Sequence, residues 1–215
     1  SMDSRPSRDS LVVSESAVVD ACGETPLPEL GIIEQVWETD PIPQNKIAER
    51  AAAAFSSLSL SDVPAGGEVA LGVGSRGIAN LDTIVEGVVA AAKDLGYEPF
   101  VFPAMGSHGG ATADGQREML SELGVTEASI GCEIRSRMTV TEVGRTPERD
   151  IPVVADEYAA AADAIVPINR IKPHTDFDGT VESGLSKMLV IGMGKQRGAK
   201  IAHDWAVDWS LRNMI

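Results

Sequence analysis

The sequence has few aromatic residues, few cysteines and no long apolar run. Phenylalanine, tryptophan and tyrosine make up 4% of its 215 residues, whereas alanine, valine and glycine are abundant. This balance favours a parallel sheet covered by small-residue helices over a β-sandwich. Cys22 and Cys132 cannot form a disulfide framework, which is typical of a reducing cytoplasm. No apolar stretch reaches the roughly 18 residues that span a bilayer, and no secretory signal opens the chain, so we expect a cytoplasmic protein.

Positive charge is also scarce. The 18 basic and 32 acidic residues give a net charge of −14, which argues against nucleic acid or a membrane surface as a partner. Residues 170–203 are the exception, because basic residues outnumber acidic ones there and two of the three histidines lie among them. Chance clustering on a surface is one interpretation of this stretch, and an anion-binding region is the other.

The pattern of apolar residues predicts a Rossmann-like α/β domain with helices on both faces of a parallel sheet. We assign residues 1–25 to a tail or edge segment and residues 26–215 to this domain. Strands are expected at 30–37, 68–73 and 97–105, and helices at 45–58 and from 80 to the glycine at 96. Two successive strand–loop–helix units favour parallel strands.

Shorter elements are expected further along the chain. A helix should begin at Thr112 or Asp114 and stop at Gly124. Strands are expected at 132–136, 138–143, 151–155 and 164–168, the last of a fully buried type, with a helix from 157 to about 162. Residues 201–215 predict one amphipathic helix without a stop signal. We therefore expect a missing C-terminal domain, and an apolar helix face that is exposed or covered by another copy in a homo-oligomer.

A glycine-rich turn follows the strand at 68–73. Gly72, Gly74 and Gly77 match G-x-G-x-x-G, but the next strand does not end in the acidic residue that a dinucleotide site requires. We therefore interpret the turn as one that lets a ligand approach backbone amides, and assign Gly72 and Gly74 to cofactor binding. Arg76 would bind a substrate carboxylate or phosphate, unless it simply pairs with a surface acid.

Two histidines follow predicted strands, where open α/β sheets bind ligands. His108 lies in a glycine-rich loop, and His174 follows a proline, with Asp176 and Asp178 near enough in sequence to orient its ring. Imidazole titrates in the range that proton transfer requires. We therefore assign both histidines to acid–base catalysis, with a purely structural loop role as the alternative.

Lys187 and His203 are the other candidate site residues. Apolar neighbours on both sides of Lys187 predict partial burial, which would lower the pKa of its amine and make it a nucleophile; a snorkelling lysine is the alternative. His203 precedes or opens a helix and is either a polar cap residue or a metal ligand. The three histidines could together bind zinc, although they lack the short spacing of common zinc motifs.

Four segments, in order over roughly residues 60–215, together resemble the nickel-dependent lactate racemase family. They are GSHGGAT at 106–112, RIKPHT at 170–175, GLSKM at 184–188, and His203.

The resemblance implies a racemase that uses nickel held in a pyridinium mononucleotide, the nickel-pincer cofactor. Lys187 would anchor this cofactor covalently and His203 would ligate the nickel. His108 and His174 would exchange the hydroxyl proton on the two faces of a 2-hydroxy acid, while the α-hydride moves to the pyridinium and returns. The family also uses groups from a C-terminal domain that lies outside this sequence, so activity is expected of the longer chain.

The first loop departs from the family, which carries an aspartate, closely spaced arginines and a proline there. Here the loop contains Ser75 and a single arginine, Arg76, which opens the substrate to 2-hydroxy acids other than lactate. Two rival functions stay open on the residues alone. One is a zinc hydrolase that uses the three histidines, and the other is a binding module that holds an organic anion without chemistry.

Overall fold

The computed structural model describes residues 14–23, 31, 40–75, 77–173, 178–179 and 181–214. The chain divides into two compact units, residues 1–41 and 42–215. In the first unit the structure has a helix, α1 (Glu15–Cys22), and the hydroxyl of Ser14 caps it by accepting a hydrogen bond from Ala17 N–H. The sequence predicted an irregular tail or an edge strand there. Of the strand expected at 30–37, only Gly31 lies within the described residues.

Three parallel strands form the sheet of the second unit. They are β1 (Glu68–Val73), β2 (Glu98–Pro103) and β5 (Ala164–Ile168), in the order β2-β1-β5. The two neighbours of β1 follow it by long connections that contain helices, as parallel pairing requires. The predicted α/β class with a parallel sheet is therefore confirmed.

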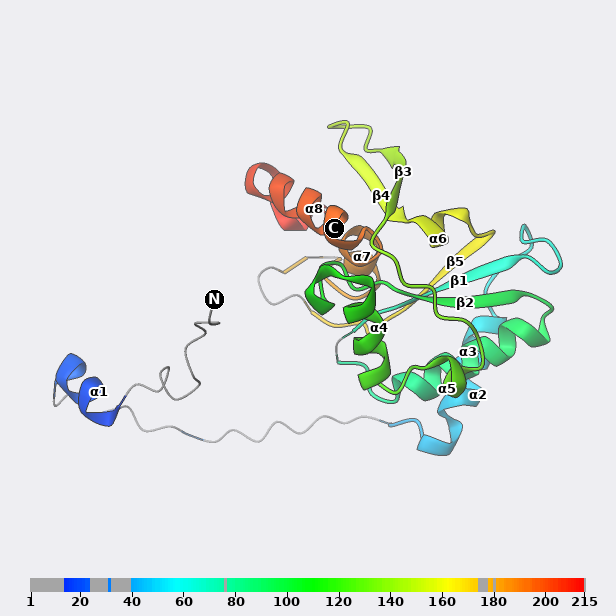
Figure 1. The fold of residues 1–215 in the computed structure, drawn as a ribbon, viewed down its shortest axis with the longest axis horizontal. Helices are drawn as coiled ribbons and strands as arrows, with labels where there is room; N and C mark the ends of the chain where they lie inside the picture. Colours follow the sequence, from blue (N-terminus) through cyan, green and yellow to red (C-terminus); the bar gives the residue numbers. More distant parts are fainter. Residues whose placement is uncertain are drawn as a thin grey trace, which may run out of the picture. The chain divides into compact units, whose positions relative to one another are not determined.

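Helices pack on both faces of this sheet (Figure 1). Helices α2 (Ile47–Ser56) and α3 (Leu81–Asp94) cover one face, and α6 (Glu157–Ala161) lies on the other. Side chains of β1 alternate between the two cores, as expected for a strand. The α3 side receives Val69, Leu71 and Val73. The α6 side receives Ala70, with Phe100 and Phe102 of β2, so the domain is Rossmann-like.

Several predicted helix boundaries are confirmed. Thr112 caps α4 (Ala113–Glu122) by accepting a hydrogen bond from Gly115 N–H at 3.1 Å. Gly96 and Gly124 follow α3 and α4 with positive φ angles of 83° and 80°, the left-handed conformation that ends helices. Two short helices, η2 (Gln44–Lys46) and η3 (Gly109–Ala111), precede α2 and α4.

The region between α4 and β5 differs in part from the prediction. After α5 (Glu127–Ile130), residues 132–136 form only one bridge to the sheet, between Ile134 and Val101. The next two strands, β3 (Val140–Arg145) and β4 (Pro152–Asp156), form an antiparallel hairpin. Strand β5 was expected to be fully buried. It lies instead at one side of the described sheet, and Ile165 is 36% exposed.

The predicted bounds of the C-terminal helix, residues 201–215, are wrong. After α7 (Leu185–Lys187) and the π-helix η4 (Met188–Gly192), the long helix α8 (Lys195–Trp209) begins before residue 201 and ends before residue 215. Ser210 has a φ of 69°, so it interrupts the helix before α9 (Leu211–Met214). Of the apolar residues expected to be exposed on this helix, Ala202 is buried and Trp205, Trp209 and Leu211 are half-buried, whereas Val207 is 85% exposed. None of the described helices is long and apolar enough to cross a membrane.

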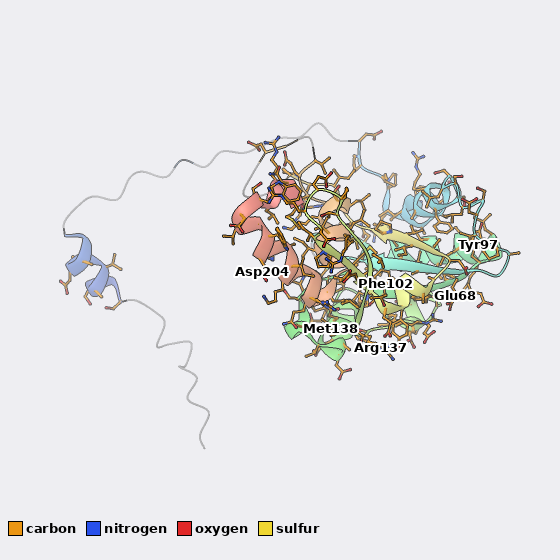
Figure 2. The ribbon with its side chains drawn as sticks, turned by 90° about the horizontal axis from the view of Figure 1, so that it is seen from above. Glu68, Tyr97, Phe102, Arg137, Met138 and Asp204 are labelled. Atoms are coloured by element: carbon orange, nitrogen blue, oxygen red, sulfur yellow. The ribbon has the colours of Figure 1, made fainter. Side chains whose placement is uncertain are left out.

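The direction of the strands places the candidate site. Figure 2 shows Glu68 and Tyr97, which mark the amino ends of β1 and β2, at one end of the domain and Asp204 on α8 at the other, with Phe102 between them. The carboxyl ends of the strands therefore lead toward the part of the domain where α7 and α8 are found (Figure 1). Open parallel sheets bind ligands at this edge.

Candidate functional site

A cavity of about 190 Å³ lies where the three parallel strands end. Its walls come from the segments that follow β1, β2 and β5 and from α7 and η4. The described lining residues are Gly74, Ser75, Ala104, Met105, His108, Asn169, Lys172, Ser183, Gly184, Lys187, Met188, Ile191 and Gly192. The structure thus brings two predicted site residues, His108 and Lys187, to one cavity from distant parts of the sequence.

The position of His108 depends on the loop after β2 and on Ser75. The Nδ1 atom of His108 lies 2.6 Å from the hydroxyl oxygen of Ser75, in the loop after β1. The backbone at Gly109 approaches the start of α4 so closely that a Cβ atom there would lie 2.5 Å from the carbonyl carbon of Gly115. The loop therefore has a tight path, and the Ser75 contact holds one nitrogen of the half-buried imidazole.

Lys187 is positioned through Asn169, which follows β5. The side-chain amide of Asn169 donates to the carbonyl of Gly184 at 3.0 Å, and its oxygen accepts from Arg170 N–H at 2.8 Å. Gly184 has a φ of 76°, and a Cβ atom there would lie 3.0 Å from the carbonyl oxygen of Arg170. Only glycine suits this junction, which joins the residue before α7 to the end of β5.

The π-helix after Lys187 packs directly on the loop after β2. Gly106 N–H donates to the carbonyl of Gly192 at 3.0 Å, and a Cβ atom at Gly192 would lie 2.5 Å from the carbonyl oxygen of Ala104. π-Helical turns are uncommon and frequent at functional sites. The close contact fixes the segment with Lys187 against the loop with His108.

Of the two glycines assigned to cofactor binding, one lines the cavity and the other does not. Gly74 lines the cavity, and a Cβ atom there would lie 3.2 Å from the side-chain oxygen of Asn169. Gly72 lies inside β1, where a Cβ atom would meet the ring of Phe102 at 2.9 Å. Gly72 is not among the lining residues, and the packing of Phe102 is sufficient reason for a glycine there.

Arg76 and His174 lie outside the described residues. Their neighbours are described: Ser75 lines the cavity, as does Lys172, two residues before His174. Lys172 and Lys187 bring positive charge to the cavity, and its described lining contains no aspartate or glutamate. In a chain of net charge −14, this local balance favours an anionic ligand.

His203 is not brought to this cavity. It is an exposed residue of α8, and its Nδ1 atom lies 2.6 Å from the carbonyl oxygen of Ala199. Because Nδ1 then carries the hydrogen, Nε2 is the nitrogen with a lone pair. Among the residues that the structure describes, no three histidine, cysteine, aspartate or glutamate side chains are grouped to hold a metal ion.

A buried polar cluster that the sequence did not predict lies behind the cavity. Lys195 is fully buried, and its Nζ atom lies 3.1 Å from Asp156 Oδ2, 3.2 Å from Gln116 Oε1 and in contact with the carbonyl oxygen of Pro103. Burial lowers the pKa of Lys195, and the nearby Asp156 carboxylate opposes that shift. The signal available in the sequence was weak, because a lysine that follows a glycine at a helix start is usually exposed.

Ser75 and Asn169 were also missed as site residues. Asn169 directly follows β5 and Ser75 lies two residues after β1, so their place after predicted strands was the signal that could have identified them. Comparison of the chain with protein-family models, with curated proteins and with solved structures finds no match.

Proposed function

We propose that the protein is a racemase or epimerase of a 2-hydroxy acid, related to the nickel-pincer lactate racemases. The observation that carries this proposal is the shared cavity of His108 and Lys187 at the carboxyl ends of β1, β2 and β5. The resemblance gives these residues roles that require one site, proton transfer for His108 and cofactor attachment for Lys187. Their shared cavity meets that requirement.

The contact with Ser75 suits His108 to reversible proton transfer. When Nδ1–H donates to the Ser75 hydroxyl oxygen, 2.6 Å away, Nε2 is the ring nitrogen with the lone pair, and we assign to it the uptake of the hydroxyl proton of the substrate. The protonated ring keeps the same contact, since Nδ1 is a donor in both states. Ser75 therefore holds the ring in one orientation while Nε2 takes up and returns a proton.

The residues fit the nickel-pincer cofactor in part. Lys187 is one of the residues that line the cavity, as an anchor must be, and Gly74 lines it too, where a Cβ atom would lie 3.2 Å from the side-chain oxygen of Asn169. His203 has Nε2 available for a metal because Nδ1 contacts the Ala199 carbonyl, although its ring does not line the same cavity. When bound, the cofactor would supply a pyridinium ring that accepts and returns the electron pair of the substrate α-C–H bond.

The charge of the cavity fits the substrate class. A 2-hydroxy acid carries a carboxylate, and Lys172 lines the cavity together with Lys187. With Lys187 occupied by the cofactor, Lys172 and Arg76 are the cations that we assign to the carboxylate. His174, two residues beyond Lys172, is assigned to proton transfer on the opposite face of the substrate.

Racemisation assays on the full-length protein test this function. Protein from cells that make the nickel cofactor should interconvert the enantiomers of at least one small 2-hydroxy acid, as followed by chiral chromatography. His108→Ala should lower the rate by about 10²–10⁴-fold, the contribution of a general acid–base group, and should keep the covalent adduct. Lys46→Ala, which removes an exposed ion pair with Glu49 on α2, is the matched control and should retain activity.

The cationic cavity favours a second candidate, a module that binds an organic anion without chemistry. The same variant separates the two functions. A binding module would show no turnover of any enantiomer in the wild type, and His108→Ala would leave its affinity for 2-hydroxy acids nearly intact.

A further inference from the structure

Gln116 and Lys195 form a buried pair directly behind the loop that carries His108. Both side chains are fully buried, and neither lines the cavity. Phe102, labelled in the interior in Figure 2, has its ring centroid 5.8 Å from Lys195 Nζ. Neither side chain of the pair therefore reaches a ligand in this cavity, so the pair can affect the chemistry only by positioning other residues.

The lysine determines which way the Gln116 amide points. Lys195 Nζ can only donate, and it lies 3.2 Å from Gln116 Oε1. The amide nitrogen then faces the loop after β2, where it donates to the carbonyls of Gly106 at 2.9 Å and His108 at 3.2 Å. The flipped amide would place its NH₂ group against the ammonium and its oxygen against two carbonyl oxygens. Such a flip is excluded by repulsion at both ends.

The backbone of Lys195 supports a specific role for this residue. Its φ of 54° lies in the left-handed region, which non-glycine residues adopt only where the surrounding structure requires it. The side chain also bridges the end of β2, through the carbonyl of Pro103, and the end of β4, through Asp156. An apolar residue would have filled the same interior space without the need to bury a charge.

We infer that Gln116, oriented by Lys195, is a positioning residue that holds the His108 loop so that Nδ1 of His108 meets Ser75. The expected effect on catalysis rests on the proposed function. The expected effect on the orientation of His108 does not depend on that function. Without the two hydrogen bonds to Gly106 and His108, the loop keeps its backbone contacts, including the one between Gly106 and Gly192, but its carbonyls at Gly106 and His108 are no longer held by Gln116. The imidazole should then leave its single hydrogen-bonded orientation.

The test uses Gln116→Glu, which keeps the size of the side chain and its contact with Lys195 but cannot donate to the two carbonyls. Gln116→Met, which removes every polar contact, is the second variant if the first does not fold. Arg117→Met is the matched control, because Arg117 is the next residue of α4 and contacts Ile134 and Glu127 instead of the loop.

The main readout is the imidazole ¹H–¹⁵N spectrum of full-length protein labelled with ¹⁵N at histidine. In the wild type and Arg117→Met, His108 should show one dominant tautomer, because its Nδ1 atom keeps the contact with Ser75. In Gln116→Glu its signals should broaden or shift toward a tautomer mixture, while His203 on α8 remains unchanged and serves as the internal reference. A folded Gln116 variant with wild-type His108 signals would overturn the inference.

The kinetic readout separates this inference from the proposed function. In cofactor-loaded enzyme, Gln116→Glu should lower kcat by at least about tenfold and change KM less than threefold, as expected when a proton-transfer group is misplaced but binding is kept. An altered His108 spectrum in a protein without racemase activity would support the positioning role and reject the racemase. An altered spectrum with wild-type kcat in an active racemase would overturn the catalytic part of the inference.

Discussion

Replacement of Asp156 by asparagine should strongly destabilise the domain. The side chains of Lys195 and Asp156 are both fully buried, with Nζ 3.1 Å from Oδ2. The other described partners of Nζ, the Pro103 carbonyl and the Gln116 amide oxygen, are uncharged. Asp156 is therefore the one described counter-charge of a buried ammonium, and removal of one partner from a buried ion pair typically costs about 3–5 kcal/mol.

Asparagine isolates the effect of the charge. Asp156 Oδ1 also caps α6, by accepting hydrogen bonds from Tyr158 N–H at 2.9 Å and Ala159 N–H at 3.1 Å. Asparagine caps helices about as well as aspartate, so this contribution is retained. A loss of about 3 kcal/mol would lower Tm by about 6–12 °C, since 1 kcal/mol corresponds to about 2–4 °C in domains of this size.

The loss should depend on pH. Burial lowers the pKa of Lys195, and Asp156 opposes that shift, so Asp156→Asn should lower the pKa of Lys195 further. Between that folded-state pKa and the unfolded value of about 10.4, the unfolded chain binds more protons, and stability rises with pH. The deficit of the variant should therefore be largest at the lowest pH and should shrink as the pH rises toward 10.

Urea unfolding at pH 6, 8 and 9.5 measures this effect. The control is Glu157→Gln, which removes the neighbouring exposed ion pair with Arg137 and should change stability by less than about 1 kcal/mol. The reasoning is refuted if Asp156→Asn is no less stable than this control, or if its deficit is the same at all three pH values.

Three further predictions concern the site and its packing. Ser75→Ala should lower kcat by about two- to tenfold with little change in KM, because a neutral hydrogen bond to His108 contributes about 0.5–1.5 kcal/mol; an unchanged kcat in steady-state assays would exclude a role for Ser75. Gly192→Ala should lower the free energy of unfolding by about 1–3 kcal/mol, because its Cβ would lie 2.5 Å from the Ala104 carbonyl oxygen; a wild-type denaturation curve would contradict this packing. Burial raises the pKa of the Cys132 thiol to about 11. In a Cys22→Ser background, alkylation of Cys132 at pH 8 should therefore be about 100-fold slower than that of an ordinary cysteine, and a rate like that of free cysteine would contradict its burial.

The parts of the fold that could be predicted are those with local causes. The strand at 164–168 matches β5, and the helix start at Thr112 and the stop at Gly96 are set by a capping hydroxyl and a positive φ. The break at Ser210 could not be predicted, because neither glycine nor proline marks it. Asn80 precedes α3 as expected, but its side chain makes no capping hydrogen bond. Its φ of 53° is left-handed, whereas a capping residue usually has an extended backbone.

The site shows the same division between local and long-range causes. His108 was predictable because it follows a strand, and so was the cavity edge at which it lies. The burial of Lys195 was not, because it depends on Gln116, 79 residues earlier, and on the end of β4. The pattern of residues near Lys195 in the sequence does not reveal such long-range contacts. Lysine side chains are usually exposed, so the residue type alone predicted exposure.

The covalent state of Lys187 tests the central claim most directly. Intact-mass spectrometry of full-length protein, purified from cells that make the nickel cofactor, should show a covalent adduct of mononucleotide size, and peptide mapping should locate it at Lys187. Lys187→Ala should have the unmodified mass and no racemase activity, whereas Lys200→Ala, which removes an exposed ion pair with Asp204 on α8, should keep the adduct. If Lys187→Ala retains full activity and the same adduct mass, the nickel-pincer assignment is contradicted.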